Sequence, residues 1–138
     1  MSNSSDPYTP EESELGLTRE TLRLLFGSGF DVQLITKSDL VVRDLDLLVK
    51  GNSTVSLTIT ALDRHTAALL EPEAPSPEKR IEAMGLLSKS GIPCAVRIDP
   101  IIRGINDGHL EELVRKVCAA GARHIVASTF KAKQDSLN

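Results

Sequence analysis

The stretch FDVQLITKSDLVVRDLDLLVKGNSTVSLTIT, residues 30–60, decides the fold class of this chain. It holds two short β-branched segments, 30–36 and 54–60, and between them an amphipathic segment that begins at Ser38 or Asp39 and is ended by Gly51. The pattern predicts strand, helix, strand. A helix between consecutive strands favours parallel pairing with a right-handed crossover.

The same alternation continues on both sides of this unit. Helices are predicted over 17–29, with Thr18 as N-cap, over 76–90, with Ser76 as N-cap, and over 107–120, with Asp107 as N-cap. Further strands are predicted around 94–100 and at 124–129. The chain is therefore expected to be α/β, either a doubly wound sheet or a partial (β/α) barrel of parallel strands with alternating helices.

Domain organisation follows from the same pattern. We expect one domain over residues 1–138, with 1–12 as a loop after a missing strand and 131–138 as a frayed tail. The alternative for the first residues is an ordinary polar leader. Four parallel strands cannot close a barrel, so the open sheet edges predict a missing segment or a homodimer.

Composition excludes several classes of function. The net charge is −3, aromatic residues make up 3% of the chain, and the sequence has no basic block, so nucleic-acid binding by this segment is not expected. Neither a membrane span nor a signal peptide is visible, which predicts a cytoplasmic protein. Cys94 and Cys118 are expected to be buried apolar residues, with a disulfide or metal role as the alternative.

Ligands of parallel α/β folds bind where the strands end, so the polar residues there are the candidate binding residues. They are Thr36, Lys37 and Ser38 after the first strand, Thr58 and Thr60 in the second, Arg97, Asp99 and Pro100 in the third, and Ser128 and Thr129 in the fourth. Lys37 would suit a carboxylate or phosphate. Arg97 and Asp99 share a face, so the alternative for them is an ion pair with each other. The spacing indicates no catalytic triad and no metal centre.

Six segments together resemble one known family. They are SDPYTPEE (5–12), GLTRETLRLL (16–25), ITKSDLVVRDLDLL (35–48), VSLTITALD (55–63), LLEPEAPSPEKRIEAMGLLSKSGIP (69–93) and VRIDPIIRGIND (96–107). Their order and spacing are similar to the radical S-adenosylmethionine (SAM) superfamily, in the branch of spore photoproduct lyase and the DNA repair photolyase-like proteins.

The resemblance implies a cofactor pair and a radical reaction. Parent enzymes bind SAM and a 4Fe–4S cluster, cleave SAM reductively to a 5′-deoxyadenosyl radical, and carry out lyase or nucleic-acid-related chemistry. The CxxxCxxC segment that ligates the cluster is absent here, so this chain alone is expected to bind no cluster and to be inactive. Asn3 stands where spore photoproduct lyases have a hydrogen-donating cysteine, which implies that the parent catalyses a different reaction.

The resemblance also assigns residues to the SAM site. It implies that Asp6 and Tyr8 lie near the SAM amino group and Lys37 near its carboxylate. Thr58 and Thr60 would lie near the ribose and carboxylate, and Asp99 and Pro100 near the adenine or ribose. Two alternatives stay open: a non-catalytic half-barrel that acts by self-association or partner binding, and a general nucleotide-binding βα fold.

Overall fold

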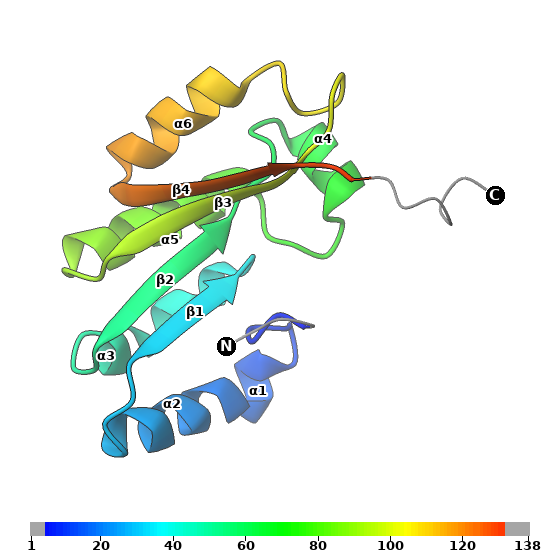
Figure 1. Cartoon of the computed structure of the whole chain (residues 1–138). Helices are drawn as coiled ribbons and strands as arrows, with labels where there is room; N and C mark the ends of the chain where they lie inside the picture. Colours follow the sequence, from blue (N-terminus) through cyan, green and yellow to red (C-terminus); the bar gives the residue numbers. More distant parts are fainter. Residues whose placement is uncertain (1–4, 132–138) are drawn as a thin grey trace.

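The computed structural model describes residues 5–131 as four parallel strands alternating with helices (Figure 1). Its elements are α1 (Glu12–Leu15), α2 (Leu17–Gly27), β1 (Val32–Thr36), the 3₁₀ helix η1 (Asp39–Asp44), α3 (Leu45–Leu48), β2 (Ser53–Thr58), α4 (Arg64–Leu70), α5 (Pro77–Lys89), β3 (Cys94–Ile101), α6 (Leu110–Ala119) and β4 (Ala122–Thr129). The strands form one sheet in the order β1-β2-β3-β4, and every neighbouring pair is parallel. The predicted α/β class with parallel strands is confirmed.

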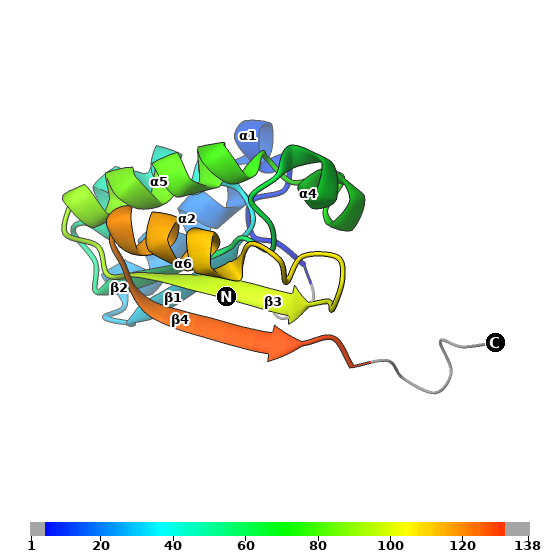
Figure 2. The same ribbon diagram turned by 90° about the horizontal axis from the view of Figure 1, so that it is seen from above.

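All the helices lie on one side of the sheet (Figure 2). Leu34 pairs with Val55 and Leu57 with Val96, and these side chains are buried under the helices. Because successive side chains point to opposite faces of a strand, the residues between them face the other side, which no helix of the described part covers. That open face carries polar and apolar side chains: Thr58 pairs with Arg97, whereas Ser56 pairs with Ile35 and Ala95.

The core is aliphatic and lies between the sheet and the helices. Its largest fully buried apolar side chains are Leu22, Leu34, Val41, Leu48, Val55, Leu57, Ile59, Met84, Leu87, Ile98 and Leu113. The scarcity of aromatic residues thus leaves Leu, Ile and Val to fill the space. None of the helices in residues 5–131 has the length and apolarity needed to cross a bilayer.

The crossover between β1 and β2 differs from the predicted single helix. Of the two predicted starts, Ser38 and Asp39, Ser38 is the N-cap, and its hydroxyl accepts a hydrogen bond from Leu40 N at 3.2 Å. The first turns are 3₁₀, and a four-residue α-helix, α3, follows. A regular helix was predicted because apolar spacing does not distinguish the two forms over so short a segment.

Two predicted helix caps are wrong. Thr18 is not the N-cap of α2: Gly16 occupies that position with a φ of 63°, and the Thr18 hydroxyl donates instead to the Pro7 carbonyl. Asp107 does not cap α6, because its carboxylate accepts from Gly104 N at 2.8 Å and closes a turn. By contrast Ser76 caps α5 as predicted. Side-chain competition within nearby turns is invisible to spacing arguments.

Candidate functional site

The loop before α1 is fastened to the carboxyl end of β1 by Asp6. One carboxylate oxygen accepts from the Thr36 hydroxyl at 2.5 Å and from Tyr8 N at 2.9 Å, and the other accepts from Lys37 N at 2.6 Å. Asp6 was predicted to contact a ligand amino group, but its carboxylate already accepts hydrogen bonds from three donors of the chain itself. Thr36 is buried and its hydroxyl also accepts from Ser38 N at 2.9 Å. Both residues shape the loop around the site.

Tyr8 is buried, and its hydroxyl points into the protein rather than outward. It donates to Asp44 Oδ2 at 3.0 Å. Burial and the adjacent Asp44 charge raise the pKa of Tyr8 strongly, so the phenol stays protonated. The Tyr8 ring, but not its hydroxyl, is left to line a binding surface.

Asp44 is the centre of a buried charge network in which Arg19, Arg43 and Glu12 also take part. We call Tyr8, Glu12, Arg19, Arg43 and Asp44 the carboxylate clamp. Arg19 Nη1 donates to Asp44 Oδ1 at 2.9 Å, and Arg43 donates to both Asp44 oxygens at 3.0 Å and to Glu12 Oε1 at 2.8 Å. Burial disfavours ionisation of Asp44, but the hydrogen bonds from Arg43 and Arg19 outweigh it and hold its pKa below the usual value. The clamp joins the first loop to η1.

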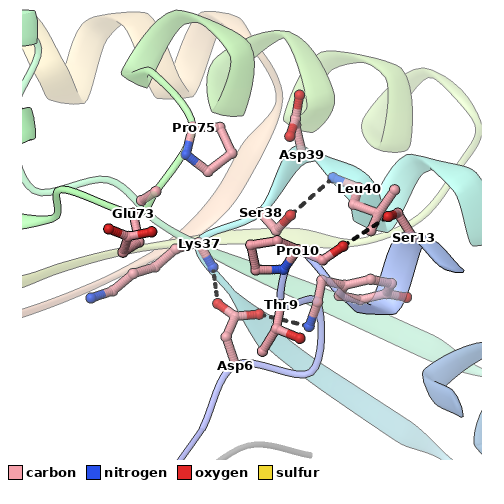
Figure 3. Close-up of a pocket in the computed structure, with 12 residues that line it drawn as sticks. Asp6, Thr9, Pro10, Ser13, Lys37, Ser38, Asp39, Leu40, Glu73 and Pro75 are labelled. Atoms are coloured by element: carbon pink, nitrogen blue, oxygen red, sulfur yellow. Dashed lines mark hydrogen bonds between the residues drawn. The ribbon is translucent and has the colours of Figure 1, made fainter. Parts of the chain in front are cut away.

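A cavity of about 390 Å³ opens between this first loop, the end of β1 and the loop between α4 and α5 (Figure 3). Of the predicted site residues, it is lined by Asp6, Tyr8, Lys37 and Ser38. Its walls include apolar atoms of Pro10, Leu40 and Pro75. In Figure 3 the Lys37 side chain runs past Glu73, away from Leu40 and Ser13. The structure thus brings the residues of the first loop and of β1 to one place.

Lys37 places its ammonium group beside Glu71. Its Nζ lies 3.3 Å from Glu71 Oε1, and the lysine side chain is 47% exposed while that of Glu71 is buried. The other carboxylate oxygen of Glu71, Oε2, accepts a hydrogen bond from Arg80 Nη1 at 2.6 Å. Lys37 is therefore a tethered but accessible cation where β1 ends.

Thr58 is the last residue of β2 and Thr60 lies two residues beyond it; both are buried. The Thr58 carbonyl accepts from Arg80 Nη1 at 2.8 Å, and the Thr60 carbonyl accepts from Asn106 Nδ2 at 2.9 Å. Within the described residues, the Thr60 hydroxyl oxygen has no hydrogen-bond partner. A buried hydroxyl without a partner is costly, so Thr60 is available to a ligand that reaches it.

Arg97 and Asp99 pair with each other, as the alternative for them predicted. Arg97 Nη2 donates to Asp99 Oδ2 at 3.0 Å, and the Ser128 hydroxyl donates to Asp99 Oδ1. Both charged side chains remain about one-third exposed, at 31% and 32%. Beside them, the Pro100 carbonyl accepts from Asn106 Nδ2 at 3.0 Å. These residues lie across β3 and β4 and do not line the cavity near Lys37.

Four residues of this region escaped sequence reasoning: Asp44, Glu71, Arg80 and Asn106. Arg80 could have been found, because it shares a helix face with the buried Met84 and Leu87, four and seven positions later. A charged residue on an apolar helix face demands a buried partner. Asn106 gave no such signal, since asparagine is ordinary in a Gly-rich turn.

The residues of this chain do not fit a 4Fe–4S cluster, whose iron atoms are held by more cysteine thiolates than this chain has. The sequence has two cysteines. Cys94 is buried, and burial raises the pKa of its thiol to about 11, whereas Cys118 is exposed, contrary to the prediction that both are buried. Within residues 5–131 no group of three or more His, Cys, Asp or Glu side chains converges as a metal site would require.

Sequence relatives share these elements over most of the chain. The model of the radical SAM superfamily matches residues 4–117. The uncharacterized protein MJ0683 of Methanocaldococcus jannaschii is 41% identical over 108 residues, which is 78% of this chain and 41% of that protein. The uncharacterized protein ORF301 of Acidianus two-tailed virus is 32% identical over 103 residues, 73% of this chain and 34% of the relative. The chain thus spans less than half the length of these relatives.

Solved structures share the fold at low sequence identity. Streptococcus suis SuiB superimposes with a TM-score of 0.68 at 14% identity, over 94% of this chain and 29% of SuiB. SuiB has also been solved bound to S-adenosylmethionine and bound to the precursor peptide SuiA. The four parallel strands and their helices therefore match part of a (β/α) barrel, and the matched family model shows that this chain belongs to the radical SAM superfamily.

Proposed function

We propose that this chain forms the SAM-binding side of a radical SAM core. The observation that carries the proposal is the Lys37 ammonium, half-exposed and tethered where β1 ends. Lys37 would bind the SAM carboxylate, because an ammonium group recognises a carboxylate by a charge-assisted hydrogen bond. The family match over residues 4–117 supports SAM as the ligand.

The neighbouring strand ends would hold the rest of SAM. The partnerless Thr60 hydroxyl, together with Thr58, would meet the ribose or the carboxylate. Asp99 and Pro100 would border the adenine or ribose from β3. The roles of Asp6 and Tyr8 near the amino group are indirect in this proposal, because both side chains are engaged within the chain and position the loop.

In a complete radical SAM enzyme, reductive cleavage of SAM at the cluster would supply a 5′-deoxyadenosyl radical, which would abstract hydrogen from a substrate. Thiolates other than Cys94 and Cys118 would have to ligate the cluster for that cleavage, so we expect this chain alone to be inactive. What its own residues contribute is binding and orientation of SAM.

The proposed branch is that of the spore photoproduct lyase-like proteins, with lyase or nucleic-acid-related chemistry. Asn3, on which the departure from photoproduct repair depends, lies outside the described residues.

Calorimetric titration of the chain tests the proposal. SAM should bind, and Lys37→Met should weaken SAM about tenfold, as expected for one charge-assisted hydrogen bond at a half-exposed position. Lys89→Met is the matched control, because Lys89 is exposed at the end of α5 and lines none of the described cavities. Binding of ATP in preference to SAM would instead support a general nucleotide-binding fold.

A second candidate function rests on the sheet edges. Within the described residues β1 pairs with β2 alone and β4 with β3 alone, so both are edge strands of the sheet, and edge strands are the places where another chain can add a strand. A non-catalytic half-barrel that self-associates through these edges would form dimers. Sedimentation velocity at rising concentration tests this function, and a monomer throughout would reject it.

A further inference from the structure

Arg80 is a fully buried cation whose place is fixed by two partners. The residue is 1% exposed, within α5, and its Nη1 donates both to the Thr58 carbonyl and to Glu71 Oε2. A buried charge is tolerated only when it is paired and hydrogen-bonded, so this geometry has little freedom. Glu71 is thereby held at a defined distance from the end of β2.

Glu71 turns its second oxygen toward the site. Oε1 is buried, has no hydrogen-bond partner within the described residues, and lies 3.3 Å from Lys37 Nζ. Lys37 is the exposed end of a row of alternating charges that begins with Arg80. Without this restraint the four-carbon lysine stem would sample many rotamers in solvent.

We infer that Glu71 is a positioning residue, which acts on a ligand only through Lys37, and that Arg80 in turn positions Glu71. The pair links the two strand ends of the site, because Arg80 holds the Thr58 carbonyl of β2 and Glu71 holds the ammonium group that follows β1. The inference rests on the proposed function, in which Lys37 binds the carboxylate of SAM. It adds a prediction that the proposed function does not make: Glu71 affects only the amino-acid end of the ligand.

The test compares two ligands and two backgrounds. SAM carries the carboxylate, whereas 5′-methylthioadenosine keeps the adenosine and sulfur but lacks the amino-acid end. Titration calorimetry with both ligands is run on the wild-type chain, Glu71→Gln, Lys37→Met and the double variant. Glu71→Gln should weaken SAM about fivefold, since an unrestrained lysine must be ordered on binding, and should leave 5′-methylthioadenosine unchanged. In the Lys37→Met background it should have no further effect on either ligand.

Each of the other possible outcomes of these titrations would reject either the inference about Glu71 or the proposed function. Equal weakening of both ligands, or the same loss in the Lys37→Met background, would mean that Glu71 acts on the fold and not through Lys37. Tighter SAM binding by Glu71→Gln would mean that Glu71 competes with the ligand for Lys37. Failure of the wild-type chain to bind either ligand would reject the proposed function, and the inference with it.

A second variant guards against loss of folding. Glu71→Gln leaves the buried Arg80 guanidinium without a countercharge, so the combined variant Glu71→Gln, Arg80→Gln replaces the ion pair by two neutral amides. The variant that combines Glu71→Gln with Arg80→Gln should show the same selective loss of SAM affinity as Glu71→Gln alone. Unchanged SAM affinity in a folded combined variant would also overturn the inference.

Discussion

Replacing Asp44 by Asn tests whether the carboxylate clamp fastens the first loop to the rest of the domain. Asp44 is 0% exposed and accepts hydrogen bonds from Tyr8, Arg19 and Arg43. An Asn side chain keeps one acceptor oxygen but turns an NH₂ group toward a guanidinium. At least two charge-assisted hydrogen bonds are lost as a result.

The size of the effect can be worked from these contacts. Each hydrogen bond to a charged group contributes about 1.5–3 kcal/mol to the free energy of unfolding. Both arginines are about one-quarter exposed, which favours the lower end of that range. We therefore expect Asp44→Asn to lower the free energy of unfolding by about 3 kcal/mol, which for a domain of this size lowers the melting midpoint by about 10 °C.

Urea unfolding followed by circular dichroism measures this loss. Asp46→Asn is the matched control, because Asp46 binds the same Arg19 but is half-exposed, and its variant should unfold close to the wild-type midpoint. A loss below about 1 kcal/mol for Asp44→Asn would refute the reasoning, because it falls short of a single charge-assisted hydrogen bond. Equal losses for the two variants would refute it as well.

Three further predictions concern acid, packing and thiols. The two clamp carboxylates, Glu12 and Asp44, have lowered pKa values, so their contribution to the free energy of unfolding should be complete above about pH 5 and should be lost progressively as pH falls below it. Urea midpoints from pH 7 to 2.5 measure this loss. Gly51→Ala should destabilise the fold, because the added methyl group would collide with the Phe26 ring. Gly27→Ala should instead stabilise the fold by about 0.5 kcal/mol, because no atom lies within 4 Å of the added methyl group; thermal melts measure both changes. Cys118 should react rapidly with a thiol reagent at pH 8, while Cys94, buried with a pKa of about 11, should react only on unfolding; equal rates would contradict the structure.

The fold could be predicted because the strands carry their signal locally. The β-branched run at 54–60 and the apolar alternation that includes Leu34, Val55 and Leu57 are typical of strands, and these three side chains are buried in the sheet. The short helix α4 was missed, because its seven residues, Arg64–Leu70, are few for an apolar period to emerge. Its N-cap Asp63, which accepts from Thr66 N at 2.8 Å, was the available signal.

The site was predictable only in part, for a physical reason. Lys37 and Thr58 could be assigned to one edge of the sheet because the ends of parallel strands meet there, and the structure places both at that edge; their contact with a ligand stays a prediction. Sequence position does not reveal which polar atoms are already engaged, so Asp6 and Tyr8 were predicted to meet ligand although the chain itself satisfies them. Partners distant in sequence, such as Tyr8 and Asp44, become visible only once the chain is folded.

A crystal structure of this chain soaked with SAM would test the central claim most directly. The account predicts SAM at the carboxyl ends of β1, β2 and β3, with its carboxylate about 3 Å from Lys37 Nζ and a ribose or carboxylate oxygen within reach of the Thr60 hydroxyl. SAM bound at the opposite edge of the sheet, or bound at the strand ends with its carboxylate away from Lys37, would contradict it.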